Sequence, residues 1–95
     1  MNTATTTPTR LERIRAALTT ALAPQFLEVI DDSHAHAGHA GALTGRGHFC
    51  VVIVADCFAG IAPLKRHRMV YSAVDSLMAT DIHALSIDAR APAER

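Results

Sequence analysis

The strongest constraint on the fold lies in the middle of the chain, where residues 49–55 form a nearly continuous apolar run. Four of these residues are Val or Ile, which favours a central strand with a neighbour on each edge. A helical pattern that opens at Pro63 comes next, and residues 82–88 then alternate as a strand does. A strand, a helix and a second strand in this order imply a parallel pair with a right-handed crossover. The segment therefore predicts a sheet that is at least partly parallel.

The N-terminal half predicts one helix and one further strand. Either the Thr-Pro pair at 7–8 or Thr9 with Glu12 three residues later would begin a helix near residue 8. Apolar residues recur at helical spacing until Pro24 ends the run, and they are Leu11, Ile14, Leu18 and Leu22. Residues 26–32 favour a strand that can pair antiparallel with the central one. The predicted class is α+β, with a three-stranded mixed sheet and helices on one face.

The length of the chain limits it to one domain. A chain of 95 residues buries on the order of 60–65% of the surface that its unfolded form exposes. Residues 1–6 are polar and repetitive in Thr, so we predict a disordered tail there and a single domain over 7–95. There is no Trp, and the large side chains expected in the core are Phe26, Phe49, Phe58 and Tyr71.

Charge and hydropathy exclude several classes of protein. Nine basic residues balance nine acidic ones, which argues against a surface devoted wholly to a polyanion. No segment approaches the roughly 18–20 apolar residues of a membrane span, and the N-terminus lacks an apolar secretory core. A cytoplasmic protein is expected, with a mitochondrial transit peptide as the weaker alternative. Cys50 and Cys57 lie too far apart along an extended run for a disulfide, so both are expected to be reduced core thiols.

The second helical run, over residues 63–80, combines a basic start with an apolar stripe. The stripe predicted to pack on the sheet consists of Leu64, His67, Val70, Tyr71, Val74, Leu77 and Met78. Lys65, Arg66 and Arg68 cluster at the start of the same helix. These three cations are candidates for contact with phosphates.

Histidine dominates the chemistry available to this chain. Six His accompany only two Cys, and no acidic cluster or nucleophile turn with a nearby base suggests hydrolysis, so no enzyme activity is expected. Residues 33–47 form a long connection that is either functional or disordered, and it carries His34, His36 and His39. Spacing alone favours a structural role for His83 at the start of the last strand. His34, His48 and His67 are also expected to be structural.

Six blocks of sequence, in order, resemble those of BolA-like proteins. They are Ser33-His34-Ala35-His36, His48-Phe49, Phe58-Ala59-Gly60, Arg66 to Tyr71, Ile82-His83-Ala84-Leu85 and Ala91-Pro92-Ala93-Glu94. The loop has no cysteine, which places the chain with the subgroup that has histidine in this loop. The resemblance implies an α-β-β-α-α-β fold related to type II KH domains. It also implies a short extra helix near residues 61–65.

The same resemblance implies a function. BolA-like proteins form heterodimers with monothiol glutaredoxins, in which the two proteins and glutathione share a [2Fe-2S] cluster. The ligand positions of the family correspond here to His83 and to His36, with His39 as a substitute because the loop is longer than in many relatives. Histidine in place of thiolate raises the potential of such a cluster. No cofactor is expected in the isolated chain, which should be a monomer or a weak homodimer.

The alternative function is regulation of transcription through nucleic-acid binding, a label that the family also carries. KH domains hold nucleic acid at a Gly-x-x-Gly loop, which corresponds here to residues 60–63. Pro63 replaces the second glycine and removes a backbone N–H, so this mode of binding is weakened. If Lys65, Arg66 and Arg68 each contact a phosphate, weak DNA binding with a log–log salt slope of about −2.7 is expected. The same cations would also suit an acidic or glutathione-bearing face of a glutaredoxin.

Overall fold

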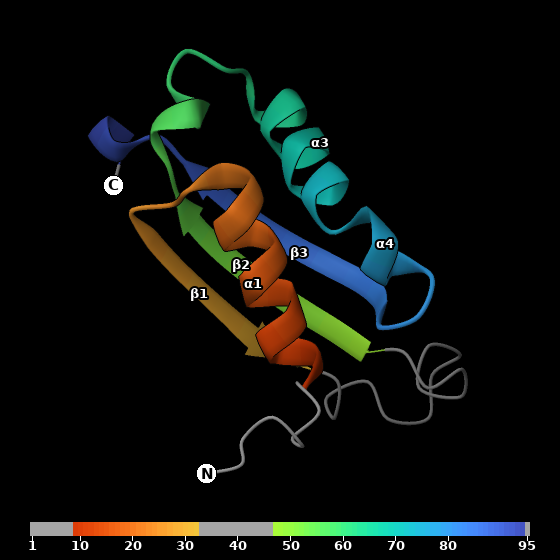
Figure 1. The fold of residues 1–95 in the computed structure, drawn as a ribbon. Coiled ribbons are helices and arrows are strands. Elements are labelled where there is room, and N and C mark those ends of the chain that lie inside the picture. The colour runs from red at the N-terminus through yellow and green to blue at the C-terminus, as the bar shows by residue number, and fades with distance from the viewer. Residues whose placement is uncertain (1–8, 33–46, 95) are drawn as a thin grey trace, which may run out of the picture.

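The computed structural model describes residues 9–32 and 47–94, which form a layer of helices on one face of a three-stranded sheet (Figure 1). In chain order the elements are α1 (Arg10–Leu22), β1 (Phe26–Asp31), β2 (Gly47–Val54), the 3-10 helix η3 (Asp56–Phe58), α3 (Pro63–Ala73), α4 (Asp75–Met78), β3 (Ile82–Arg90) and the 3-10 helix η4 (Pro92–Glu94). The predicted α+β class is confirmed. The expected tail at 1–6 and all but the last residue of the expected loop at 33–47 lie outside the described residues.

The sheet is mixed and has the order β1-β2-β3. β1 pairs antiparallel with β2, with Val29 opposite Val51, and β2 pairs parallel with β3, with Val51 opposite Ile87. β2 is therefore the central strand, as its apolar composition predicts. It begins two residues earlier than the apolar run and so includes His48.

The first helix begins at the second of the two predicted starts. The Thr9 hydroxyl accepts from the backbone N–H of Glu12 at 3.1 Å, and the Glu12 carboxylate accepts from the backbone N–H of Thr9 at 2.8 Å. This capping box satisfies two N–H groups that the helix start would otherwise leave without partners. At the other end Ala23 adopts a left-handed conformation with φ 47°, and Pro24 prevents continuation.

The core lies between the helices and the face of the sheet that they cover. Ile14 and Leu18 of α1 meet Phe49, Val51 and Ile53 of β2 in one buried cluster. Phe49 and Phe58 are 1% and 0% exposed, as predicted. The predictions for Phe26 and Tyr71 are wrong, because each is 38% exposed. Phe26 alternates with the inward residues of β1 and therefore belongs to the sheet face that the helices leave open.

The buried stripe of α3 differs from the predicted one. Arg66, Val70 and Val74 are buried at spacings of four residues, whereas Leu64 is 64% exposed and His67 is also exposed. The prediction assigned the inward face from apolar residues alone, so it could not include Arg66. The observed buried stripe is therefore shifted around the helix by about one residue from the predicted one. His67 therefore has no packing role in the core.

The extra helix predicted near residues 61–65 is absent from the described chain. The additional helical turn is η3, at Asp56–Phe58, and α3 begins only at Pro63. Ala62 has φ −65° and ψ 150°, an extended conformation that the ring of a following proline favours. The helix predicted over 63–80 is also interrupted at Val74, which has φ −110° and ψ 17°, and α4 follows it.

Side chains from the helices cap backbone carbonyls on both edge strands. The Tyr71 hydroxyl donates to the carbonyl of Leu85 at 3.1 Å, and the Arg66 guanidinium donates to that of Ala89 at 3.1 Å. Both acceptors belong to β3. On β1 the carbonyl of Leu27 accepts from Arg15 at 3.3 Å. Edge carbonyls that already have donors are less able to pair with another strand.

The two cysteines are both free, in accord with the expectation of reduced thiols. Cys50 is half-buried on β2, but Cys57 is exposed, so the expectation of two core thiols is wrong for Cys57. The reason is that the strand ends at Val54 and Cys57 belongs to η3, where its thiol lies 3.8 Å from the carbonyl of Leu22. None of the helices within 9–32 and 47–94 is long and apolar enough to cross a membrane.

Candidate metal-ligand site

His83 is an exposed imidazole at the start of β3, on an irregular part of the sheet. Gly47 pairs with Ile82 and His48 pairs with Ala84, so His83 is one extra residue on β3 at this point. A bulge of this kind redirects a side chain relative to the regular pleat and is common next to functional sites. Its neighbour Ile82 is fully buried. The backbone beneath His83 is therefore fixed while its ring faces solvent.

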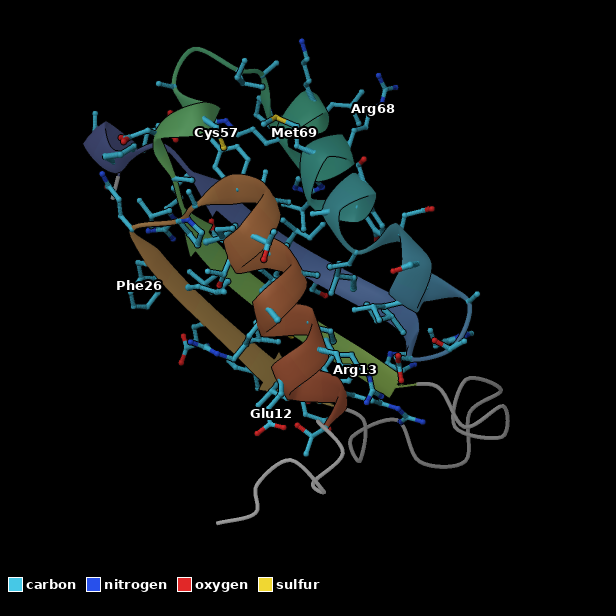
Figure 2. All side chains as sticks on the ribbon, in the orientation of Figure 1. Glu12, Arg13, Phe26, Cys57, Arg68 and Met69 are labelled. Carbon is cyan, nitrogen blue, oxygen red and sulfur yellow. The ribbon has the colours of Figure 1, made fainter. Side chains whose placement is uncertain are left out.

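Asp81 anchors the residues that precede the bulge. Its carboxylate accepts from the Arg13 guanidinium at 2.6 Å and from the Thr80 hydroxyl at 3.1 Å, and its carbonyl accepts from the backbone N–H of Gly47 at 3.0 Å. The Arg13 hydrogen bond lowers the pKa of Asp81 and outweighs the opposing effect of burial. Figure 2 shows Arg13 reaching from the N-terminal part of α1 toward this turn. These contacts join α1, β2 and the start of β3 beside His83.

The segment that carries the predicted loop ligand joins the sheet at the same end. β1 ends at Asp31 and β2 begins at Gly47, which pairs with Ile82 next to His83. The candidate ligands His36 and His39, and also His34, lie outside the described residues. Within 9–32 and 47–94, no three His, Cys, Asp or Glu side chains come together as a metal site. An exposed imidazole on an anchored backbone suits one ligand of a metal group whose other ligands come from elsewhere.

His48 contacts the candidate ligand directly. Its ring centroid lies 5.2 Å from that of His83, and the two ring planes meet at 43°. His48 is half-buried on the central strand, and its Nε2 atom is buried. From the sequence, His48 is predicted to open a strand and to have a structural role. Its proximity to His83 depends on the register of the parallel pair, which the sequence does not encode in any local pattern.

The basic cluster of α3 separates into one buried and two exposed cations. Arg66 is only 7% exposed, and its guanidinium donates to the carbonyl of Ile61 at 2.7 Å and to the two carboxylate oxygens of Glu94 at 2.5 and 2.8 Å. We call this set of contacts the Arg66 clasp, including the bond to the Ala89 carbonyl described above. Arg66 is thus occupied in holding the C-terminal residues against α3. As a candidate phosphate contact it differs from Lys65 and Arg68, which are exposed.

The clasp also determines the ionisation of Glu94. The hydrogen bonds from Arg66, with a smaller contribution from the backbone N–H of Ala91, lower the pKa of Glu94 from 4.5 to about 2. The carboxylate is therefore ionised at neutral pH and becomes protonated only as the pH approaches 2. This residue falls in the last of the six sequence blocks, which the sequence alone did not connect with Arg66.

The two exposed cations lie beside an open groove between α1 and α3. The groove has a volume of about 650 Å³, and Leu22, Met69 and Ala73 supply apolar parts of its lining, with Lys65 and Arg68 as its cations. Figure 2 shows Arg68 projecting from α3 away from the sheet. No ion pair joins Lys65 or Arg68 to another residue in the described part of the chain. Both cations are available to an external anion.

Comparisons with known proteins agree in pointing to one family. The family model described as BolA-like protein matches residues 18–94. The chain is 44% identical over 81 residues to BolA-like protein 1 of Mus musculus, covering 85% of this chain and 57% of the relative. It is 45% identical over 76 residues to the DNA-binding transcriptional regulator BolA of Escherichia coli, covering 80% and 70%. The solved structure of BolA1 from Arabidopsis thaliana superposes with a TM-score of 0.80 at 36% identity, covering 94% of this chain and 99% of that one. The chain thus spans less than two thirds of the mouse relative.

Proposed function

This chain belongs to the BolA-like protein family, and from that premise we propose that it is the partner of a monothiol glutaredoxin with which it co-ligates a [2Fe-2S] cluster. In this role the chain contributes imidazole ligands, and the glutaredoxin and its glutathione contribute thiolates. Such an adaptor acts in iron–sulfur cluster trafficking or in iron-responsive regulation, and it is not an enzyme. A cytoplasmic location is part of the same proposal.

The observation that carries the proposal is the exposed His83 on an anchored bulge. The residues around it are held by Asp81 and by the pairing of Gly47 with Ile82, so the imidazole can bind a metal without rearrangement of the sheet. The histidine-containing segment between the described ranges joins the sheet at the same end. When bound, the cluster would supply electron-transfer chemistry and a transferable iron–sulfur unit, and His ligation would raise its potential relative to all-cysteine ligation.

Mixing the protein with a monothiol glutaredoxin, glutathione, iron and sulfide under anaerobic conditions tests the proposal. We expect a one-to-one heterodimer by size-exclusion chromatography with light scattering, with two irons and two sulfides in the complex. Its visible absorbance and circular dichroism should differ from those of the glutaredoxin homodimer. If the mixture yields only the spectrum of the homodimer, the proposal is wrong.

The loop ligand is tested by a pair of single substitutions. His36→Ala should weaken the cluster complex, because the family resemblance assigns His36 as the second ligand, whereas His39→Ala should change little. Both variants should keep the far-ultraviolet circular dichroism of the native protein, because every described element lies outside this segment. Visible circular dichroism of the cluster at neutral pH reports the result. Loss in His39→Ala alone would transfer the assignment to His39, and loss in neither would mean that this segment supplies no ligand.

A second candidate function, DNA binding, is favoured by the two exposed cations at the groove and by the description of the Escherichia coli relative as a DNA-binding regulator. Because Arg66 is occupied by Glu94, only Lys65 and Arg68 of the predicted cluster remain for phosphates. The expected salt slope on duplex DNA is then about −1.8 for two contacts, smaller than the −2.7 or so that three contacts give. Fluorescence anisotropy at several salt concentrations measures it. Tight, sequence-selective binding at physiological salt that disappears in the double variant Lys65→Ala/Arg68→Ala would place this function first.

A further inference from the structure

We propose that His48 is a positioning residue for His83: the half-buried ring of His48 packs against the exposed ring of His83 and holds it in the direction in which it binds metal. The inference rests on the proposed function, since it concerns the same ligand. It assigns His48 a contact role through its ring, and it does not make His48 a ligand.

The first support is the geometry of the pair. Ring centroids 5.2 Å apart with planes tilted by 43° fall within the range in which aromatic rings attract each other. The two rings differ in how they are held. His48 belongs to the central strand, with β1 on one side and β3 on the other, and it is half-buried. His83 belongs to an edge strand and is exposed.

The second support is the bulge itself. His83 has no counterpart on β2, because the register passes from Gly47–Ile82 directly to His48–Ala84. In a regular strand, cross-strand neighbours restrict the direction of a side chain. An extra residue lacks that restriction unless another group supplies it. The ring of His48 is the aromatic neighbour that the described structure places there.

The third support concerns which part of His48 acts. Its Nε2 atom is buried, so this nitrogen does not face the solvent into which His83 projects. The ring of His48 as a whole lies beside the ring of the candidate ligand, with the two centroids 5.2 Å apart. A ligand ring that is already oriented loses less conformational entropy when it binds than a ring that rotates freely. His48 would therefore slow the release of metal from His83.

Three substitutions separate the ring of His48 from its nitrogens. His48→Phe keeps an aromatic ring and removes both nitrogens, His48→Gln keeps a polar group and removes the ring, and His48→Ala removes both. We expect the glutaredoxin complex of His48→Phe to release its cluster at nearly the native rate. His48→Gln and His48→Ala should release it roughly two- to tenfold faster, the range that corresponds to loss of one aromatic contact. Cluster transfer to apo-ferredoxin, followed by circular dichroism, measures the rate.

A second readout uses the isolated protein without any cluster. Three-bond couplings and ring-proton shifts of His83, measured by NMR, report whether its side chain occupies one rotamer. In the native protein and in His48→Phe we expect a single dominant rotamer, and in His48→Gln and His48→Ala we expect averaging. Backbone amide spectra of the same samples show that the sheet is intact. This measurement also separates positioning from loss of stability.

The outcomes that overturn the inference are distinct from those that overturn the proposed function. If His83→Ala abolishes the mixed cluster but all three His48 variants behave as the native protein does, the positioning role is wrong and the proposed function stands. If His48→Gln is native-like and His48→Phe is not, a nitrogen of His48 acts, and the ring-contact mechanism is wrong. If His83 is already averaged among rotamers in the native protein, the inference also fails. If His83→Ala has no effect on the cluster, the proposed function fails first.

Discussion

Replacing His83 with alanine should remove the mixed-complex spectrum and leave the glutaredoxin to hold its cluster as a homodimer. The reason is that the described residues offer no other exposed imidazole at this end of the sheet that could replace the ligand. The fold should survive, because the His83 side chain is exposed and the anchoring contacts are made by Asp81 and Ile82. Visible circular dichroism of the anaerobic mixture measures the effect, which we expect to be nearly complete.

His67→Ala is the matched control for this experiment. His67 is also an exposed histidine, but it belongs to α3 and lines a different surface, near Leu64 and Tyr71. Its removal should leave the cluster spectrum and the lifetime of the complex unchanged. Equal losses in His67→Ala and His83→Ala would indicate that the spectrum depends on general histidine content, and the assignment of His83 would not hold. An unchanged spectrum in His83→Ala would remove His83 from the ligand set.

Replacing Arg66 with methionine should lower Tm by roughly 10–20 °C, because it removes hydrogen bonds to four acceptors at once in a domain of this size. The buried guanidinium joins the carbonyls of Ile61 and Ala89 to the carboxylate of Glu94. Methionine replaces the length of the side chain but not its donors. Thermal unfolding followed by circular dichroism measures the change.

Arg68→Met is the control for the loss of a positive charge from α3, and it should shift Tm by no more than about 2 °C because the side chain is exposed.

Glu94→Gln tests the ionic part of the clasp and should lower Tm by less than Arg66→Met does. The difference in Tm between the native protein and Glu94→Gln should become smaller as the pH falls. The pKa of Glu94 falls from 4.5 to about 2 on folding, so its contribution is complete above pH 4.5 and declines as pH falls toward 2. The Tm of native protein and of Glu94→Gln should therefore converge near pH 2. Equal Tm losses in Arg66→Met and Arg68→Met would contradict the clasp.

The elements of the fold could be predicted largely because each has a local signal. The capping box at Thr9 and Glu12, the apolar run of β2 and the proline that opens α3 are all visible within a few residues. The inward face of α3 could not be predicted in the same way. Its first buried residue is Arg66, whose partners Ala89 and Glu94 are more than twenty residues away in the chain. A charged residue on a packing face is explained only by those distant acceptors.

The candidate site shows the same division between local and distant information. His83 could be selected because it opens a strand within a block shared with a known family. The bulge that makes His83 an extra residue, and the contact with His48, arise from the register between two strands separated by α3 and α4. Asp81 was missed because nothing near it in sequence indicates that Arg13 is its partner. Aspartate immediately before an inward-facing strand residue is the weak signal that was available.

The capping of Leu85 and Ala89 on β3 has a consequence for how this protein can join another chain. A partner that extends the sheet by β-augmentation needs the carbonyls of an edge strand, and here the hydroxyl of Tyr71 and the guanidinium of Arg66 already donate to two of them. To add a strand at this edge, an incoming chain would first have to displace these two side chains of α3 from their carbonyls. Fibril formation through pairing of β3 edges between copies of the chain is disfavoured for the same reason. A partner is therefore not expected to pair with the β3 edge while Tyr71 and Arg66 keep these two contacts.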